Sequence, residues 1–435
     1  MGGQSAMLRL LITGGDNMFG RAIQLSCWAQ SPGDDDVRDS QRAVDYLRAC
    51  LACESADDAP LPLSRIREMN RTGAYLWGDY LGLALRPPPD LRLFNLETAV
   101  CTTLDNDDVP YFKGINYHLH SDNLRDVLSS YASETHGDAE PSPYVISFAN
   151  NHAMDFGRKA FDDETMPMMR KHSYNVVGAG ETIREAARPV EFVLGGECHV
   201  QVFAMGAACS GTSYEWAARP DRSGVFWVPG LASGASVDRA FDAIHAALGQ
   251  HPKRGERSVR IVSIHWGPNW AYRYGPDDGQ AYRRQLAHRL IDGAGVDIIY
   301  GHSSHHVRGL ERYRGKLIVY GAGDLVNDYF CFENLGDEPY NKLGALYVVD
   351  VDPGSGDLRR VQLIPMFMDR LRLRRLQRGS RIWDARRHRL RPPDPNAVDE
   401  FREFVNRLSF LDSSPGNALM FRAADDAHGP TLVYP

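Results

Sequence analysis

Short apolar runs alternate along the chain with amphipathic stretches. Apolar residues recur at helical spacing in segments 122–130, 158–171 and 280–291, which predicts helices there. Six runs rich in β-branched and other apolar residues end at polar or small residues, which is typical of buried strands. These runs cover residues 8–13, 91–95, 144–148, 260–264, 297–300 and 316–320. Strands that alternate with helices indicate an α/β layered fold.

Polar clusters follow five of these strands directly. They are Asp16, Asn95-Leu96-Glu97, Asn150-Asn151-His152, His265 and His302–His306. In layered α/β folds, functional sites form where loops leave the carboxyl ends of strands. We therefore expect the five clusters to converge on one site.

The side chains at these strand ends offer oxygen and imidazole donors and no thiolate. The candidate metal ligands are Asp16, Glu97, Asn151, His265 and His305. This donor set suits one or two divalent ions, whether Mn, Fe, Zn, Mg or Ca. Taken singly, each residue would more often cap a helix or satisfy loop backbone. The joint pattern favours a metal site, because Asn150-Asn151-His152 is very polar for the end of a buried strand.

Composition excludes several classes of function. The 435 residues are 43% hydrophobic and 24% charged, as in ordinary globular proteins. A net charge of -7 gives no basic field for nucleic acid. The N-terminal apolar run stops at Gly14-Gly15, and no segment has the roughly 18 apolar residues needed to cross a bilayer. Seven scattered cysteines predict no disulfide framework, and we expect a cytoplasmic protein without a membrane partner.

Changes in composition along the chain predict one main domain with two insertions and a C-terminal part. We place this domain at residues 1–368, with insertions at about 28–90 and 209–258. Residues 369–435 form a C-terminal part, with a basic segment at 370–391 and a helix near 398–408 that packs on the main domain.

Several motifs together resemble the CapA family of poly-γ-glutamate capsule-synthesis proteins. The most specific string is Ala149-Asn150-Asn151-His152-Ala153-Met154-Asp155-Phe156-Gly157, and Gly15-Asp16, Asn95–Thr98, Val177–Gly180, Ser263–Gly267 and Gly301–Glu311 accompany it. The resemblance runs from about residue 8 to residue 328. It implies a calcineurin-like metallophosphatase fold, a layered β-sandwich flanked by helices with helical insertions.

The resemblance also implies roles for the strand-end residues. Asp16 would bind one metal ion and His305 would complete that site. Glu97 would bridge to a second ion, held by Asn151 and His265. His152 would be the acid beside the metals.

One departure from the CapA pattern concerns a metal ligand, and one further feature is shared with the CapA group but not with typical phosphoesterases. The family usually reads G-x-H-P-H where this chain has Gly301-His302-Ser303-Ser304-His305-His306, so Ser303 replaces a ligand of the second metal. Met18 stands where typical phosphoesterases have a histidine. His302 then has three possible roles: substitute ligand, acid/base group, or packing.

The resemblance extends to CapA-like enzymes of peptide natural-product pathways, including the lasso-peptide epimerase of this family. We therefore expect a metal-dependent peptide epimerase that converts an L residue to the D form by proton transfer at Cα. The candidate proton-transfer groups are His152, His302, His305 and Asp16. Trp266 and Trp270 would line the cleft for a precursor peptide, or only pack.

Two other classes of function stay open. One is a CapA-type metallophosphoesterase or poly-γ-glutamate capsule enzyme, and the other is a metal-poor protein that binds a peptide in the same cleft. No pyridoxal lysine, dinucleotide fingerprint or P-loop stands in a convincing context, so we expect neither pyridoxal phosphate nor a nucleotide as cofactor.

Overall fold

The computed structural model describes most of the chain. The described residues are 7–31, 42–53, 60–83, 85–104, 108–110, 113–132, 141–195, 197–270, 279–331, 343–384 and 389–434. Within them, no helix is both long and apolar enough to span a bilayer.

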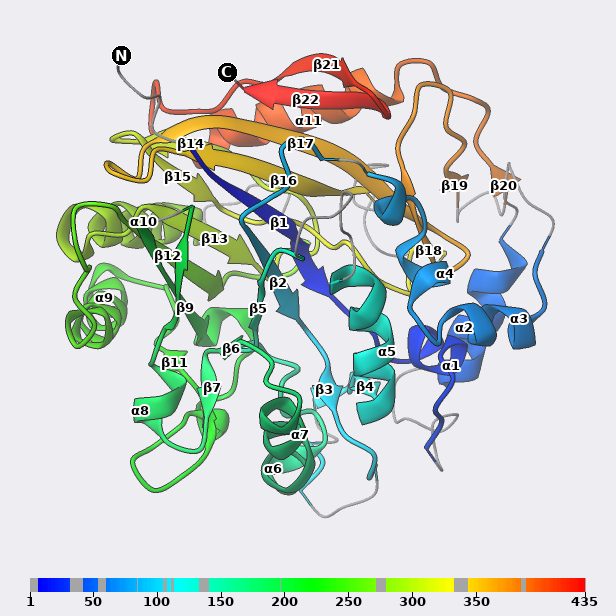
Figure 1. The fold of residues 1–435 in the computed structure, drawn as a ribbon, viewed down its shortest axis with the longest axis horizontal. Helices are drawn as coiled ribbons and strands as arrows, with labels where there is room; N and C mark the ends of the chain where they lie inside the picture. The colour runs from blue at the N-terminus through cyan, green and yellow to red at the C-terminus, as the bar shows by residue number, and fades with distance from the viewer. Residues whose placement is uncertain are drawn as a thin grey trace.

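Two large sheets form the centre of the fold (Figure 1). The first has the order β21-β22-β17-β16-β1-β2-β5-β6, with β18 added to β17. Its strands are β1 (Leu8–Asn17), β2 (Leu91–Leu96), β5 (Tyr144–Ser147), β6 (Val176–Val177), β16 (Leu343–Val351), β17 (Leu358–Asp369), β18 (Arg372–Arg375), β21 (Arg422–Asp426) and β22 (Gly429–Tyr434). Strands β1, β2, β5 and β6 are parallel, so their carboxyl ends share one edge.

The second sheet has the order β11-β9-β12-β13-β15-β14, with β8 added to β9. Its strands are β8 (Val190–Leu194), β9 (Cys198–Ala207), β11 (Trp227–Val228), β12 (Ser258–His265), β13 (Ile298–His302), β14 (Leu310–Tyr313) and β15 (Lys316–Val319). Parallel pairing joins β9, β12, β13 and β15. All six predicted strands and the predicted layered α/β class are confirmed.

The two sheets pack against each other across one hydrophobic core. That core contains buried residues from both sheets, and hydrogen bonds also cross the interface. The hydroxyl of Tyr300 on β13 donates to the carbonyl of Gly14 on β1 at 2.7 Å. Ser263 on β12 donates to the hydroxyl of Ser147 on β5 at 2.9 Å. The carboxyl ends of β1, β2, β5, β12 and β13 therefore meet between the sheets.

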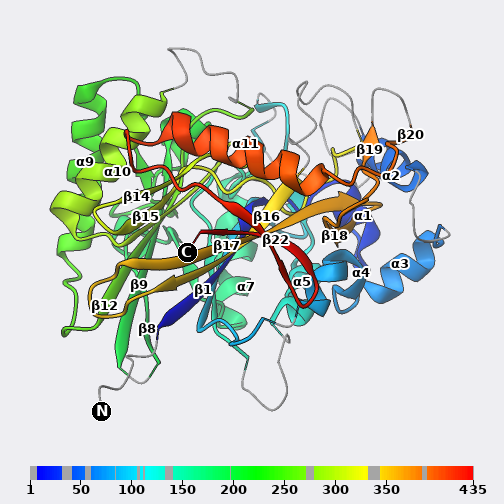
Figure 2. The same ribbon diagram turned by 90° about the horizontal axis from the view of Figure 1, so that it is seen from above.

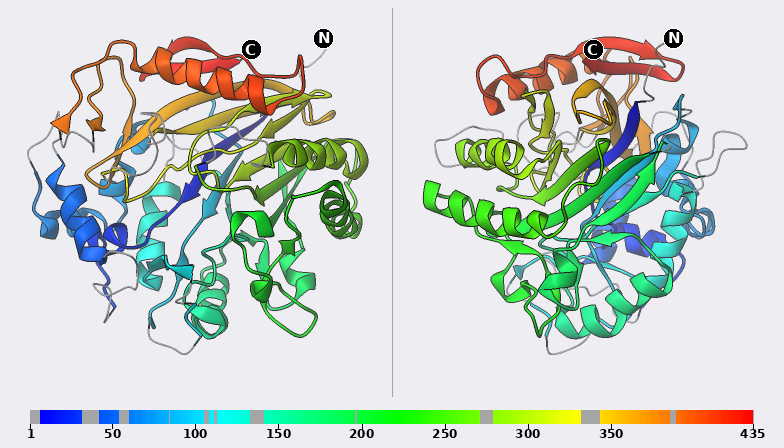
Figure 3. Two further views of the ribbon diagram at one scale, coloured as in Figure 1. Left: turned by 180° about the vertical axis from the view of Figure 1, so that it is seen from behind. Right: turned by 60° about the vertical axis from the view of Figure 1, so that its left-hand side comes forward.

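Helices cover the outer faces of this sandwich. They are α1 (Ala22–Ser26), α2 (Ala43–Ala52), α3 (Leu63–Met69), α4 (Ala74–Trp77), α5 (Ser121–Ala132), α6 (Gly157–Ala160), α7 (Met166–Lys171), α8 (Ile183–Ala186), α9 (Gly234–Gly249), α10 (Gln280–Ala294) and α11 (Ala397–Asp412). Helices α9 and α10 pack on the second sheet through a core of their own. The helices of the 28–90 insertion gather at the opposite end of the molecule from α9 and α10 (Figures 1 and 3).

The C-terminal part completes the first sheet. Strands β21 and β22 pair with each other, and β22 pairs with β17. Helix α11 runs alongside these strands (Figure 2) and buries Phe401, Val405 and Leu408. The proposed boundary at residue 368 falls inside β17, and it stays a prediction.

Candidate metal centre

A β-bulge directs Asp16 into the space between the sheets. The register between β1 and β2 shifts between Ile12 and Asp16. Gly14 within the bulge has φ +63°, and a Cβ at Gly15 would lie 2.7 Å from the carbonyl oxygen of Gly323. The two glycines therefore allow a turn and a close approach that larger residues would prevent. This local distortion presents the Asp16 carboxylate at the site.

Two donors fix the Asp16 carboxylate. Asn95 donates from Nδ2 to Oδ1 at 2.9 Å, and the backbone N–H of Ser303 donates to Oδ2 at 2.9 Å. The Ser303 hydroxyl instead donates to the carbonyl of Gly267 at 2.9 Å. Ser303 has φ 97°, a strained conformation for a residue with a Cβ. Where the family pattern has a histidine, this chain therefore supplies a backbone amide.

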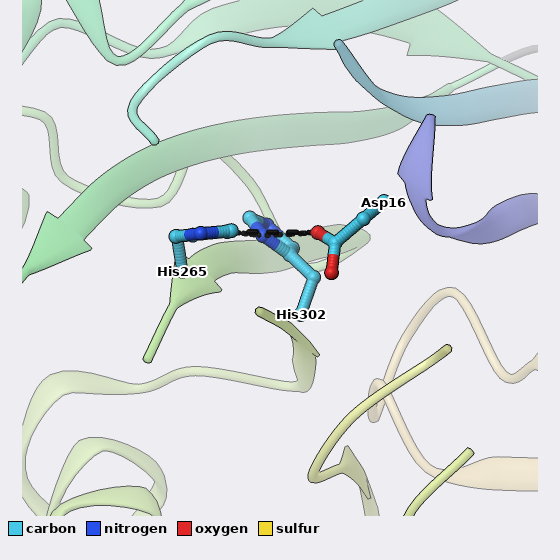
Figure 4. Close-up of side chains that lie close together, drawn as sticks. All are labelled: Asp16, His265 and His302. Atoms are coloured by element: carbon cyan, nitrogen blue, oxygen red, sulfur yellow. Dashed lines mark hydrogen bonds and ion pairs between the residues drawn. The ribbon is translucent and has the colours of Figure 1, made fainter. Parts of the chain in front are cut away.

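Asp16, His265 and His302 form the first donor group (Figure 4). One ligand atom from each lies within 4.8 Å of the others. Nδ1 of His265 is 2.7 Å from Nδ1 of His302 and 3.6 Å from Oδ1 of Asp16. On the other side of the His265 ring, Nε2 lies 2.9 Å from Oδ1 of Asn151 and 3.3 Å from Oε1 of Glu97.

His302 is fully buried at the back of this group. Its Nε2 contacts the Ser263 hydroxyl at 2.8 Å, and its Nδ1 is 3.8 Å from Oδ1 of Asp16. Both ring nitrogens therefore face polar partners. This position fits the predicted substitute ligand better than simple packing.

Asp16, His305 and Asp324 form the second donor group. Nδ1 of His305 lies 2.8 Å from Oδ1 of Asp324 and 3.7 Å from Oδ2 of Asp16. The Tyr329 hydroxyl donates to Asp324 and lies 3.2 Å from Nδ1 of His305. Burial alone would lower the pKa of His305, but Asp324, Glu97 and Asp16 outweigh it and raise that pKa to about 10.

The sequence prediction missed Asp324. It follows β15 in the string Gly321-Ala322-Gly323-Asp324, much as Asp16 follows Gly14-Gly15 on β1. A carboxylate after a glycine-rich strand end was therefore a usable signal. It was overlooked because the resemblance assigned no role to that position.

Glu97 lies at the centre of the site without a hydrogen-bonding partner. It is 0% exposed, and among the described residues neither carboxyl oxygen has a hydrogen bond. Burial raises the pKa of Glu97 to about 7. A buried carboxylate whose oxygens make no hydrogen bond is costly, so the position calls for a cation or a proton.

The nearby imidazoles are suited to bind a cation. Burial lowers the pKa of His265 to about 4 and also lowers that of His302 well below its ordinary value. Both rings are therefore neutral near pH 7, the form that ligates metals. Oxygen and imidazole donors around an unpaired carboxylate fit a divalent cation.

The Asp155 carboxylate holds His152 at the edge of the donor groups. Nδ1 of His152 lies 2.5 Å from Oδ2 of Asp155 and 2.9 Å from Nζ of Lys113. The backbone N–H of Tyr117 also donates to Asp155, at 2.6 Å. Nε2 of His152 faces Glu97, with 4.0 Å to Oε1. Burial lowers the pKa of His152 to about 4, so the ring is neutral near pH 7, and with Nδ1 held by Asp155 its Nε2 can accept a proton.

The structure brings together every predicted ligand and proton-transfer group, while their roles stay predictions. Trp270 stacks on His305 with ring centroids 5.3 Å apart and is partly exposed. The prediction that Trp266 lines the substrate cleft is wrong. Trp266 is 1% exposed in the core under α10, and its indole N–H donates to the carbonyl of Tyr320 at 2.9 Å.

Comparisons with known proteins find a matching family and several similar proteins. Residues 10–329 match the family described as "Bacterial capsule synthesis protein PGA_cap". A "Probable polyglutamine synthesis accessory protein" of Mycobacterium tuberculosis is 34% identical over 387 residues, which cover 88% of this chain and 90% of that protein. The "PGA biosynthesis protein CapA" of Bacillus subtilis is 32% identical over 187 residues, 42% of each chain. A solved structure titled as a novel phosphatase from Mycoplasma pneumoniae aligns with TM-score 0.39 and 10% identity, over 84% of this chain and 95% of that one.

Proposed function

The chain belongs to the PGA_cap family of bacterial capsule synthesis proteins, and from this premise we propose a metal-dependent hydrolase of the CapA type. Its reaction would cleave a phosphoester-type bond during assembly of an acidic polymer such as poly-γ-glutamate. The names of the reported relatives support this capsule reading and give no support to the expected lasso-peptide epimerase.

The observation that carries the proposal is the position of His152 beside a donor set suited to metal. Asp155 fixes Nδ1 at 2.5 Å, and Nε2 faces Glu97 at 4.0 Å. A histidine oriented through one nitrogen can exchange a proton with substrate through the other. In hydrolysis such a group can accept the proton of the attacking water.

The remaining residues of the site would hold the metal ions, fix the Asp16 carboxylate and contact the substrate. Asp16, His265 and His302 would hold one ion, with Asn151 and Glu97 beside His265 as further donors, and Asp16 with His305 and Asp324 would hold a second. When bound, divalent ions lower the pKa of water and polarise the bond to be cleaved. Asn95 and the Ser303 amide keep Asp16 in place. The partly exposed Trp270 would contact the substrate.

Phosphodiesterase activity toward bis(4-nitrophenyl) phosphate in the presence of Mn²⁺ tests the proposal. Replacing His152 with alanine should lower kcat by roughly 10² to 10⁴, the usual range for a general acid or base, while bound Mn²⁺ is unchanged. His172→Ala is the matched control, because His172 is exposed at the end of α7. No Mn²⁺-dependent hydrolysis, or an unchanged kcat for His152→Ala, would contradict the proposal.

One observation keeps peptide epimerisation as a second candidate. His305 is paired with Asp324 just as His152 is paired with Asp155, so the site contains two imidazoles that are each oriented by a carboxylate. Epimerisation needs two proton-transfer groups on opposite faces of a Cα, whereas phosphoester hydrolysis needs fewer. Incubation of a candidate precursor peptide in D2O would introduce one deuterium at Cα if the site epimerises. If phosphate is released from a phosphorylated substrate and no deuterium enters the peptide, only the hydrolase proposal remains.

A further inference from the structure

Three of the seven cysteines gather in one place, outside the two donor groups. Cys50 lies on α2 and Cys53 directly follows it, a C-x-x-C spacing that the expectation of scattered cysteines overlooked. Cys331 comes from the segment that follows β15. All three are buried, with exposed fractions of 0%, 2% and 7%.

Cys50 and Cys331 are in direct contact. Their Sγ atoms lie 3.3 Å apart, against about 2.0 Å in a disulfide. The carbonyl of Asp328 accepts the Cys50 thiol at 2.9 Å and the Cys331 thiol at 3.6 Å. The Cys53 thiol donates to the carbonyl of Ala49 at 3.3 Å and also has a side-chain hydrogen bond with Cys331.

The geometry favours a pair of thiols over a metal site. A structural zinc site requires four ligands around one point. Among the described residues, no group of three potential ligands within 4.8 Å contains a cysteine. The close Cys50–Cys331 contact therefore points to two-thiol chemistry.

We propose that Cys50 and Cys331 form a disulfide when the protein meets a low-molecular-weight disulfide. The Cys331 thiol, the more exposed of the two, loses its proton and attacks the oxidant, which releases one small thiol and leaves a mixed disulfide. Cys50 then loses its proton and attacks the Cys331 sulfur, which releases the second small thiol. The two protein thiols are oxidised by two electrons, and one small disulfide is reduced to two thiols.

The bond would fasten α2 of the helical insertion to a segment next to the metal centre. The Asp328 carboxylate accepts the backbone N–H of Ala22 at 2.9 Å and pairs with Arg21. The next residue, Tyr329, contacts both Asp324 and His305. The proposal stands on this geometry and does not depend on the proposed reaction.

Oxidation of the folded, full-length protein tests the proposal. Glutathione disulfide at about pH 8.5 is a suitable oxidant, because both thiols have raised pKa values, Cys331 chiefly through its hydrogen bond with Cys50 and Cys50 through burial. The raised pKa values slow the reaction at neutral pH. We expect a loss of two hydrogens in the intact mass, and one linked pair of proteolytic peptides containing Cys50 and Cys331. The melting temperature should rise by a few degrees and fall back on reduction.

Serine variants at each position separate the outcomes. Cys50→Ser and Cys331→Ser should each abolish the linked peptide and the rise in melting temperature. Cys53→Ser and Cys27→Ser are matched controls at other buried cysteines, and both should keep the link. A Cys50–Cys53 link, or unreacted thiols in the folded wild type after prolonged oxidation, would overturn the proposal. The mass change and the linked peptide of the wild-type protein test the proposal even if one of the variants fails to fold.

Discussion

Asp324 sets the charge of His305 in the cation-free protein. The pKa of His305 is about 10 in the fold against an ordinary 6.5, so folding favours its protonated form. The stability from this pair is therefore complete below about pH 6.5 and is lost as the pH rises through about 10. Asp324→Asn should lower the free energy of unfolding at pH 7 by about 2 to 4 kcal/mol. Urea unfolding of metal-free protein at pH 7 and pH 10.5 measures this.

The difference between wild type and Asp324→Asn should shrink toward pH 10.5. Asp238→Asn is the control, because Asp238 pairs with Arg289 at the surface and is 60% exposed. It should change stability by less than about 1 kcal/mol. A pH-independent difference for Asp324→Asn would refute the assignment of the high pKa to His305.

Asp155 orients His152 and would act on the reaction only through it. Asp155→Asn should lower kcat about 10- to 100-fold with Mn²⁺ content unchanged, since the cation ligands stay in place. The pH profile of kcat should also move, because the pKa of His152 depends on Asp155. Asp163→Asn, at an exposed position, should match the wild type. Loss of bound Mn²⁺ in Asp155→Asn would show that Asp155 supports the ligands instead.

Some site residues could not be predicted from local sequence. Lys113 contacts His152 only because the fold brings the two segments together, and no spacing signals it. Trp266 follows His265 directly, but successive residues of an extended chain point to opposite faces. His265 therefore enters the space between the sheets while Trp266 enters the core under α10. The strand-end polar residues, by contrast, were predictable because their chemistry is unusual for buried positions.

The bulge at the end of β1 is the element on which Asp16 depends. A Cβ on residue 15 would collide with the backbone of Ala322 and Gly323. Gly15→Ala should therefore lower the free energy of unfolding by about 2 to 4 kcal/mol and weaken Mn²⁺ binding. Gly249→Ala is the control, since Gly249 ends α9 and a Cβ there meets nothing within 4 Å. It should leave stability unchanged or raise it by up to about 1 kcal/mol. Urea unfolding measures the stability of the two variants, and Mn²⁺ titration measures their affinity for the ion. If Gly15→Ala has the stability and Mn²⁺ affinity of the wild type, the bulge tolerates a side chain.

Element prediction located the buried strands and the helix at 158–171, but it did not reveal a local change of helix type. The predicted strands at 8–13 and 260–264 are parts of longer buried strands. The predicted helix at 158–171 is divided into α6, a π-helical turn at Phe161–Thr165, and α7. Pro167 lies in the first turn of α7 and lacks the N–H that a continuous helix would use. Helical spacing alone cannot show this change in hydrogen bonding.

Cation binding should stabilise the whole molecule, because donors from both sheets meet at the site. At about 100 times its Kd, Mn²⁺ should raise the free energy of unfolding by about 2.7 kcal/mol. Chelation should remove this gain, and added Mn²⁺ should restore it. Asp16→Asn should show no such response, because Asp16 belongs to both donor groups. A wild type whose melting temperature ignores both chelator and Mn²⁺ would argue against a metal centre.

The two strands that pair with β1 are synthesised at very different times. On one side it pairs with β2, but on the other it pairs with β16 at Leu343–Val351. At about 5 to 20 residues per second, the ribosome needs on the order of tens of seconds between β1 and β16. During that interval the strand that carries Asp16 has one unpaired, apolar edge. Stalled or truncated chains should therefore aggregate and require chaperones, even when most of the metal ligands have already been synthesised.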